Sequence, residues 1–124
     1  MLSHDVDHGI LVIVPQGNTA LPERQAFYET IRRDARVRDS VCVIVDARDA
    51  AGATEEMVRE RAQTMVAQLA PRTIRACAVL MAGDGQLEAR AFRVGASSVG
   101  VRVGVFSDEI LARQWLSAYQ GQQG

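Results

Sequence analysis

Three charged side chains directly follow an apolar run that ends at Val45, and they are the best candidates for chemistry in this chain: Asp46, Arg48 and Asp49. A carboxylate at this place could accept a phosphoryl group, contact a ligand or cap the following turn. Phosphoryl acceptance also requires an acidic pair after the first core strand and a lysine late in the sheet. The chain has Pro15-Gln16-Gly17 at the first place and contains no lysine. We therefore expect ligand or partner contact, or a local cap in which Arg48 pairs with an acid; the cap is the simpler interpretation.

Four residues near the N-terminus have the side chains of metal ligands: His4, Asp5, Asp7 and His8. If this segment is extended, the two histidines lie about 13 Å apart along the strand. A shared zinc ion needs bonds of about 2 Å, so the spacing disfavours a common site. We expect these residues to be exposed on an edge strand, and we expect no metal site.

A glycine-containing turn, Gly83-Asp84-Gly85, follows a later apolar run. A dinucleotide fingerprint would need a third glycine where the chain has Glu88, so the motif is weak evidence for nucleotide binding. Asp84, and Arg90 on the next segment, could instead contact an anion or a partner. A solvated helix face is the competing interpretation.

The nucleophilic side chains have contexts that do not favour catalysis. Cys42 and Cys77 each lie inside an apolar run, which is typical of a small buried hydrophobe. Ser97 and Ser98 lack a nucleophile elbow, and both histidines fall within the first eight residues. The absence of lysine also excludes a Schiff base. We expect neither a catalytic set nor a cofactor.

Composition is that of one globular domain covering residues 1–124, with 48% hydrophobic and 23% charged residues. A formal net charge of −1 gives no general attraction to nucleic acid. No apolar run approaches the roughly 20 residues of a bilayer span, and the start of the chain lacks a signal pattern. We expect a cytoplasmic protein without an integral membrane segment.

Strand-like and helix-like segments alternate along the chain. The predicted strands cover residues 2–7, 10–14, 41–45, 74–81 and 101–106. Helices are predicted from Gly17-Asn18-Thr19 to a solvated end near residue 38, from an N-cap at Thr54 to Pro71, over 87–97, and from Ser107 to Tyr119. The inward stripes are expected to be Phe27 and Ile31 in the first helix; Val58, Ala62, Met65, Val66 and Leu69 in the second; and Leu111, Trp115 and Ala118 in the last. The solvated end of the first helix would carry Arg32, Arg33, Arg36 and Arg38.

This alternation predicts an α/β fold with a five-stranded, mostly parallel sheet and about four helices. The short turn His8-Gly9 makes the first strand an antiparallel edge. In parallel sheets ligands bind where strands end and helices begin, so the loops at 15–19, 46–54, 82–86 and 106–108 should share one rim. A free edge strand is also compatible with a homodimer.

Several of these segments together resemble the SpoIIAA-like (STAS-like) family: Gly17-Asn18-Thr19, Val43-Ile44-Val45-Asp46-Ala47-Arg48, and Val101-Arg102-Val103-Gly104-Val105-Phe106 before Ala112 and Trp115-Leu116. The resemblance implies a superhelix of β and α units. It also implies a regulatory domain that binds a protein partner and is switched by phosphorylation of a serine in an Asp-Ser-Ser-Gly turn. The matching turn here is Asp49-Ala50-Ala51-Gly52, without either serine. Thr54 is the local candidate for a phosphate acceptor, and an ordinary N-cap is the better explanation for it.

We therefore predict a non-enzymatic binding or regulatory module that recognises a protein partner through the loop rim. The alternative is a small apolar ligand or lipid held between helices and sheet. The basis of that alternative is that the other branch of this fold resembles the lipid-carrying CRAL-TRIO domains. Asp46, Arg48 or Arg90 would then be its polar anchors.

Overall fold

A computed structural model of the protein describes residues 2–15, 21–48, 55–69, 73–81 and 100–120. Its strands form one sheet in the order β1-β2-β3-β4-β5, in which β1 is antiparallel to β2 and the other neighbours are parallel. The α/β class, the mostly parallel sheet and the antiparallel edge are thereby confirmed. The strands are β1 (Leu2–Asp7), β2 (Ile10–Pro15), β3 (Ser40–Asp46), β4 (Thr73–Leu80) and β5 (Arg102–Phe106), and the helices are α1 (Leu21–Arg33), α2 (Glu55–Leu69) and α4 (Glu109–Gln120).

The described residues contain three helices, whereas the sequence predicts about four. The predicted helix over 87–97 and the predicted caps at Gly17-Asn18-Thr19 and Thr54 lie outside the described residues. The first helix ends at Arg33, earlier than expected, so Arg36 and Arg38 belong to the turn that leads into β3.

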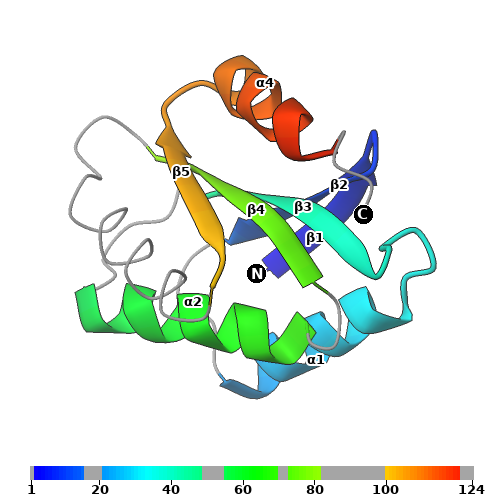
Figure 1. The fold of residues 1–124 in the computed structure, drawn as a ribbon. Coiled ribbons are helices and arrows are strands. Elements are labelled where there is room, and N and C mark those ends of the chain that lie inside the picture. The colour runs from blue at the N-terminus through cyan, green and yellow to red at the C-terminus, as the bar shows by residue number, and fades with distance from the viewer. Residues whose placement is uncertain (1, 16–20, 49–54, 70–72, 82–99, 121–124) are drawn as a thin grey trace.

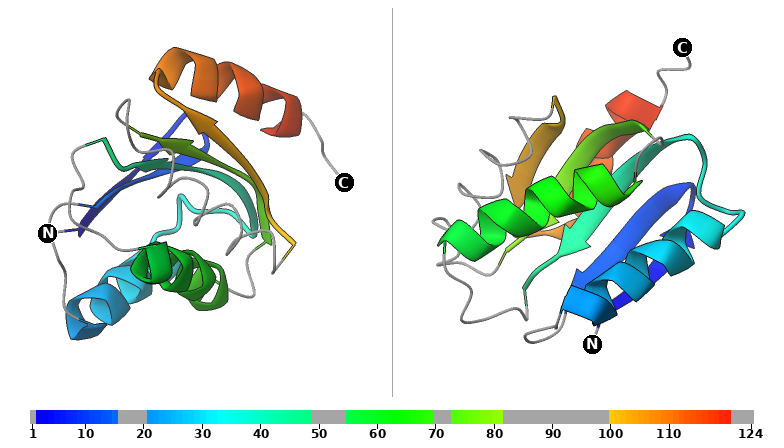
Figure 2. Two further views of the ribbon diagram at one scale, coloured as in Figure 1. Left: turned by 90° about the vertical axis from the view of Figure 1, so that its left-hand side faces the viewer. Right: turned by 90° about the horizontal axis from the view of Figure 1, so that it is seen from below.

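Helices cover both faces of the sheet, with α1 and α2 on one side and α4 on the other (Figures 1 and 2). Alternation along β3 supplies both cores, because Val41, Val43 and Val45 face α1 and α2 while Cys42 and Ile44 face α4. The stripe residues predicted for the first two helices are confirmed where they are described. The buried members are Phe27 and Ile31 of α1 and Ala62, Met65 and Leu69 of α2, with Val66 half-buried beside them.

Of the stripe predicted for α4, Trp115 packs against the core, but Leu111 and Ala118 are wrong. Ala112 and Leu116 are fully buried, whereas Leu111 and Ala118 are exposed. The small Ala112 belongs to the same core cluster as Ala76 and Ala78 of β4, so the helix approaches the sheet there.

The aromatic side chains of α4 lie at the border of this contact. The ring of Trp115 is half-buried, 5.5 Å from that of Phe106 and 5.0 Å from that of Tyr119. Its placement requires Gly104 in β5. A Cβ atom on Gly104 would lie 2.8 Å from Cε2 of Phe106 and 3.2 Å from Cη2 of Trp115. Gly104 therefore allows the rings of Phe106 and Trp115 to approach the backbone of β5 closely.

Replacing Gly104 by alanine is expected to destabilise the protein by about 1–3 kcal/mol, because the new methyl group overpacks the Phe106–Trp115 contact. Without this contact, alanine would stabilise a strand by restricting the unfolded chain, so the sign of the effect is diagnostic. Urea unfolding measures it. In a Phe106→Leu background the cost of Gly104→Ala should fall, and a neutral or stabilising effect in the wild-type background would contradict the packing described.

Candidate functional site

The carboxyl edge of the sheet carries the first predicted site residues. Asp46 ends β3 and pairs in register with Leu80, which in turn pairs with Phe106. Its Oδ1 accepts hydrogen bonds from the backbone N of Arg48 at 3.3 Å and from Nε at 2.9 Å, and its Oδ2 lies 2.8 Å from Nη2. The Arg48 side chain is the main reason that the pKa of Asp46 is below its ordinary value, despite partial burial. The cap-and-pair interpretation of Asp46 and Arg48 is thus confirmed.

The remaining predicted site residues lie outside the described residues: Asp49, Thr54, Asp84 and Arg90. Of the predicted site residues, the structure therefore brings together Asp46 and Arg48. The rest of the predicted loop rim stays a prediction.

Two exposed apolar side chains lie at the same edge, where α4 begins shortly after the end of β5. Ile110 is 67% exposed and Leu111 is 53% exposed, and these are the exposed large hydrophobic residues of the described chain. On α4 they lie away from the side that carries the buried residues Ala112 and Leu116. The sequence had placed Leu111 in the core, so its exposure was missed.

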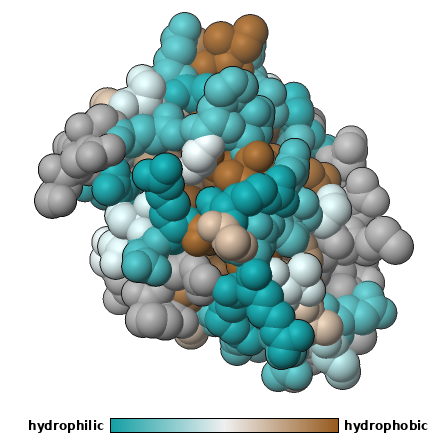
Figure 3. All heavy atoms as spheres, turned by 90° about the vertical axis from the view of Figure 1, so that its right-hand side faces the viewer, coloured by the Kyte–Doolittle hydropathy of each residue, from teal (hydrophilic) through white to brown (hydrophobic). Residues whose placement is uncertain are grey.

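A cavity of about 330 Å³ lies at the opposite, amino edge of the parallel strands. Two residues of β3 and one residue of the turn before it line the cavity. The other lining residues come from the β1–β2 turn, β4 and the end of α4. The lining residues are His8, Gly9, Arg38, Ser40, Cys42, Arg75 and Gln120. In Figure 1 the β1–β2 turn and the start of β3 lie on the right, the side that Figure 3 faces. There, hydrophilic side chains surround patches of hydrophobic atoms.

The sequence did not predict this cavity, because ligands of parallel sheets are expected at the carboxyl ends of the strands. One signal was present: Arg38, Ser40 and Cys42 follow at intervals of two, which places them on one face of a strand. Both cysteines are buried and free, as predicted. Burial raises the pKa of Cys42, an effect partly offset by Arg75, and it raises the pKa of Cys77 to about 12. Both thiols are therefore protonated near neutral pH and are poor nucleophiles.

Comparisons with known proteins give no relative. No family model matches the chain. Searches of curated proteins and of solved structures likewise find no match. Within the described residues, none of the helices has both the length and the apolar composition that a bilayer span requires.

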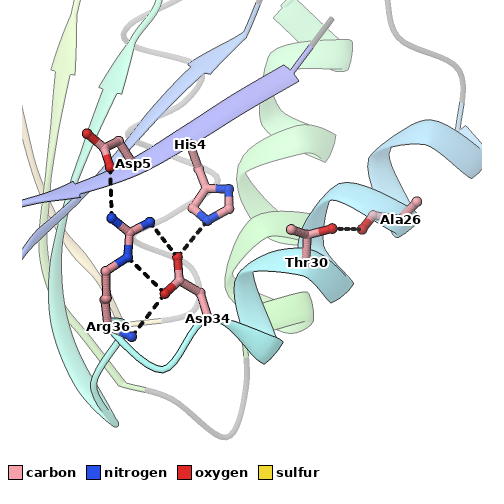
Figure 4. Close-up of polar contacts among 6 residues, drawn as sticks. All are labelled: His4, Asp5, Ala26, Thr30, Asp34 and Arg36. Atoms are coloured by element: carbon pink, nitrogen blue, oxygen red, sulfur yellow. Dashed lines mark hydrogen bonds and ion pairs between the residues drawn. The ribbon is translucent and has the colours of Figure 1, made fainter.

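The histidine and aspartate residues near the N-terminus form two separate groups. Nε2 of His4 lies 3.0 Å from Oδ2 of Asp34 (Figure 4). The His4 ring stands edge-on to that of Phe27, with 5.8 Å between the ring centres. At the other end of β1, Nδ1 of His8 lies 2.6 Å from Oδ1 of Asp7. No group of three or more such side chains could hold a metal ion among the residues described.

This arrangement corrects the prediction for His4 and adds ion pairs to the exposed Arg36. The side chain of His4 is only 12% exposed, not an exposed edge residue, because it is packed beneath the turn after α1. Arg36, expected at a solvated helix end, bridges Oδ2 of Asp34 at 2.9 Å and Oδ1 of Asp5 at 3.1 Å (Figure 4). These contacts fasten the turn after α1 to the edge strand β1.

Asp34 accepts hydrogen bonds from two other side chains in this group, His4 and Arg36. Hydrogen bonds from the Arg36 side chain and backbone, and then from His4, hold the pKa of Asp34 well below its ordinary value of 3.8. A depressed pKa in the folded state means that the carboxylate stabilises the fold at pH values above 3.8. That contribution is lost as the pH falls through the lower folded-state value.

Asp34→Asn is therefore expected to lower the free energy of unfolding at pH 7. The difference from wild type should shrink steadily once the pH falls below about 4. Urea unfolding between pH 7 and pH 2 measures this. Asp39→Asn, which makes the same charge change at a nearby exposed position, serves as the control. A deficit of Asp34→Asn that is constant over the whole pH range would refute the electrostatic origin.

Proposed function

We propose that the protein is a STAS-like, non-enzymatic binding or regulatory module that recognises a protein partner. The contact surface is the carboxyl edge of the sheet together with the start of α4. The observation that carries the proposal is the exposure of Ile110 and Leu111 at this edge, which we call the α4-start patch. Single exposed apolar residues are ordinary on protein surfaces, so the argument depends on their adjacency and their surroundings.

The α4-start patch is not needed to hold α4 on the sheet, since Ala112 and Leu116 provide the buried contact. The pair Asp46–Arg48 lies two strands away from Phe106, at the same edge from which α4 begins. Protein interfaces combine an apolar centre with a polar surrounding. Because the Asp46 carboxylate is already paired with Arg48, the polar part of this edge supports recognition better than chemistry.

The sequential strand order also supports the STAS-like part of the proposal. With β2, β3, β4 and β5 parallel neighbours in chain order, and helices α1 and α2 connecting the first three, the chain follows a repeated β–α path. A cytoplasmic location belongs to the same proposal. Phosphorylation of Thr54 and homodimer formation stay predictions from the sequence. The alternative of a small apolar ligand also stays a prediction from the sequence. The cavity described does not support it, because two arginines line that cavity.

The test is affinity capture from a lysate of the native host, with quantitative mass spectrometry of the bound proteins. Ile110→Asp/Leu111→Asp should reduce recovery of the specific partner by about tenfold or more, because a buried unpaired carboxylate opposes an apolar contact. The matched control is Ser117→Asp/Ala118→Asp, which adds the same charge at exposed positions farther along α4.

Circular dichroism and thermal unfolding establish that all three proteins are folded. Recovery that is equal for the wild type and both double variants would remove the α4-start patch from the proposal. If the wild type itself recovers no stable partner, the proposed function fails.

A further inference from the structure

The cavity at the amino edge depends on an irregularity in the sheet. Val41 of β3 pairs with Ile74 of β4, but the next residue, Cys42, pairs with Ala76. Arg75 is therefore an extra residue that forms a β-bulge in β4. Its neighbour Ile74 packs toward α1 and α2, and its other neighbour, Ala76, packs toward α4. Bulges redirect side chains and occur often beside binding sites.

The bulge brings the Arg75 guanidinium to the end of α4. Its Nη1 donates to the carbonyl oxygens of Tyr119 and Gln120 at 3.2 and 3.3 Å, and its Nε donates to Oγ of Ser40. These bonds cap the negative end of the helix and fix the guanidinium in position. Within the described part of the chain, Nη2 of Arg75 has no acceptor.

Arg38 supplies a second positive charge to the cavity. It stands two residues before Ser40, and none of its nitrogens has an acceptor among the described residues. The Ser40 hydroxyl accepts from Arg75 and so keeps its own proton for donation. Three donor groups, from the turn before β3, from β3 and from β4, thus line one space.

Among the residues that the structure describes, no acidic side chain lines the cavity to balance these charges. Asp7, beside the lining residue His8, pairs with His8 at 2.6 Å and with Nη2 of Arg113 at 2.9 Å. A guanidinium group is a positively charged donor whose planar arrangement of N–H groups suits the oxygens of carboxylate and phosphate.

We infer that this cavity binds the carboxylate or phosphate group of a small organic anion between Arg38 and Arg75, with Ser40 as a third donor. The volume is at the lower end of the range for ligand pockets, so it suits a small metabolite. This site is on the opposite edge of the sheet from the α4-start patch, and it does not depend on the proposed function.

Titration followed by NMR tests the inference, with inorganic phosphate and succinate as the two probes and sodium chloride holding the ionic strength constant. The expected result is saturable shifts of the backbone amides of Gly9 and Ser40 and of the Nε–H groups of Arg38 and Arg75. Saturation with only one probe identifies which oxyanion the site prefers. Absence of saturable shifts with both probes overturns the inference.

Matched variants separate a built site from general charge attraction. Arg38→Gln should weaken binding of the effective probe by about tenfold, because it removes a charged donor. Arg33→Gln removes the same charge from an exposed position on α1 and should leave affinity unchanged. Ser40→Ala should also weaken binding. Unchanged affinity in Arg38→Gln, or equal loss in Arg33→Gln, overturns the inference.

Discussion

The burial of the central strand on both faces is the constraint from which the rest of the architecture follows. All five residues from Val41 to Val45 are buried, so β3 can exist only with apolar cover above and below the sheet. Its backbone groups are satisfied by parallel ladders to β2 and β4. Cover comes from α1 and α2 on one face and from α4 on the other, which makes the fold a three-layer arrangement (Figure 2).

A sheet built in this way confines polar chemistry to its ends. At the carboxyl end, Asp46 and Arg48 satisfy one another, and the neighbouring feature is apolar. At the amino end, the described residues that line the cavity with Arg38 and Arg75 include no carboxylate. The two ends therefore differ in the kind of molecule that each can attract, although the same strands form both.

Local sequence patterns predict most of the sheet, because apolar runs and period-two alternation reflect burial directly. They also identify the Asp46–Arg48 pair, whose members are only two residues apart. The phase of α4 could not be found in this way, since the larger Leu111 suggested a core position that the smaller Ala112 occupies. The contact of His4 with Asp34 spans 30 residues, and the Arg75 bulge arises from pairing between two strands. Neither has a local signature.

The hydrogen bond from Nε2 of Gln120 to the carbonyl oxygen of His8 joins positions 112 residues apart. His8 has a φ of 52°, a left-handed conformation that the turn before Gly9 must hold. Contacts of such long separation form late, because the intervening chain must first be ordered. During synthesis on the ribosome, the hairpin and β3 emerge well before the last helix. One wall of the amino-edge cavity is thus completed only after the chain has been made as far as Gln120.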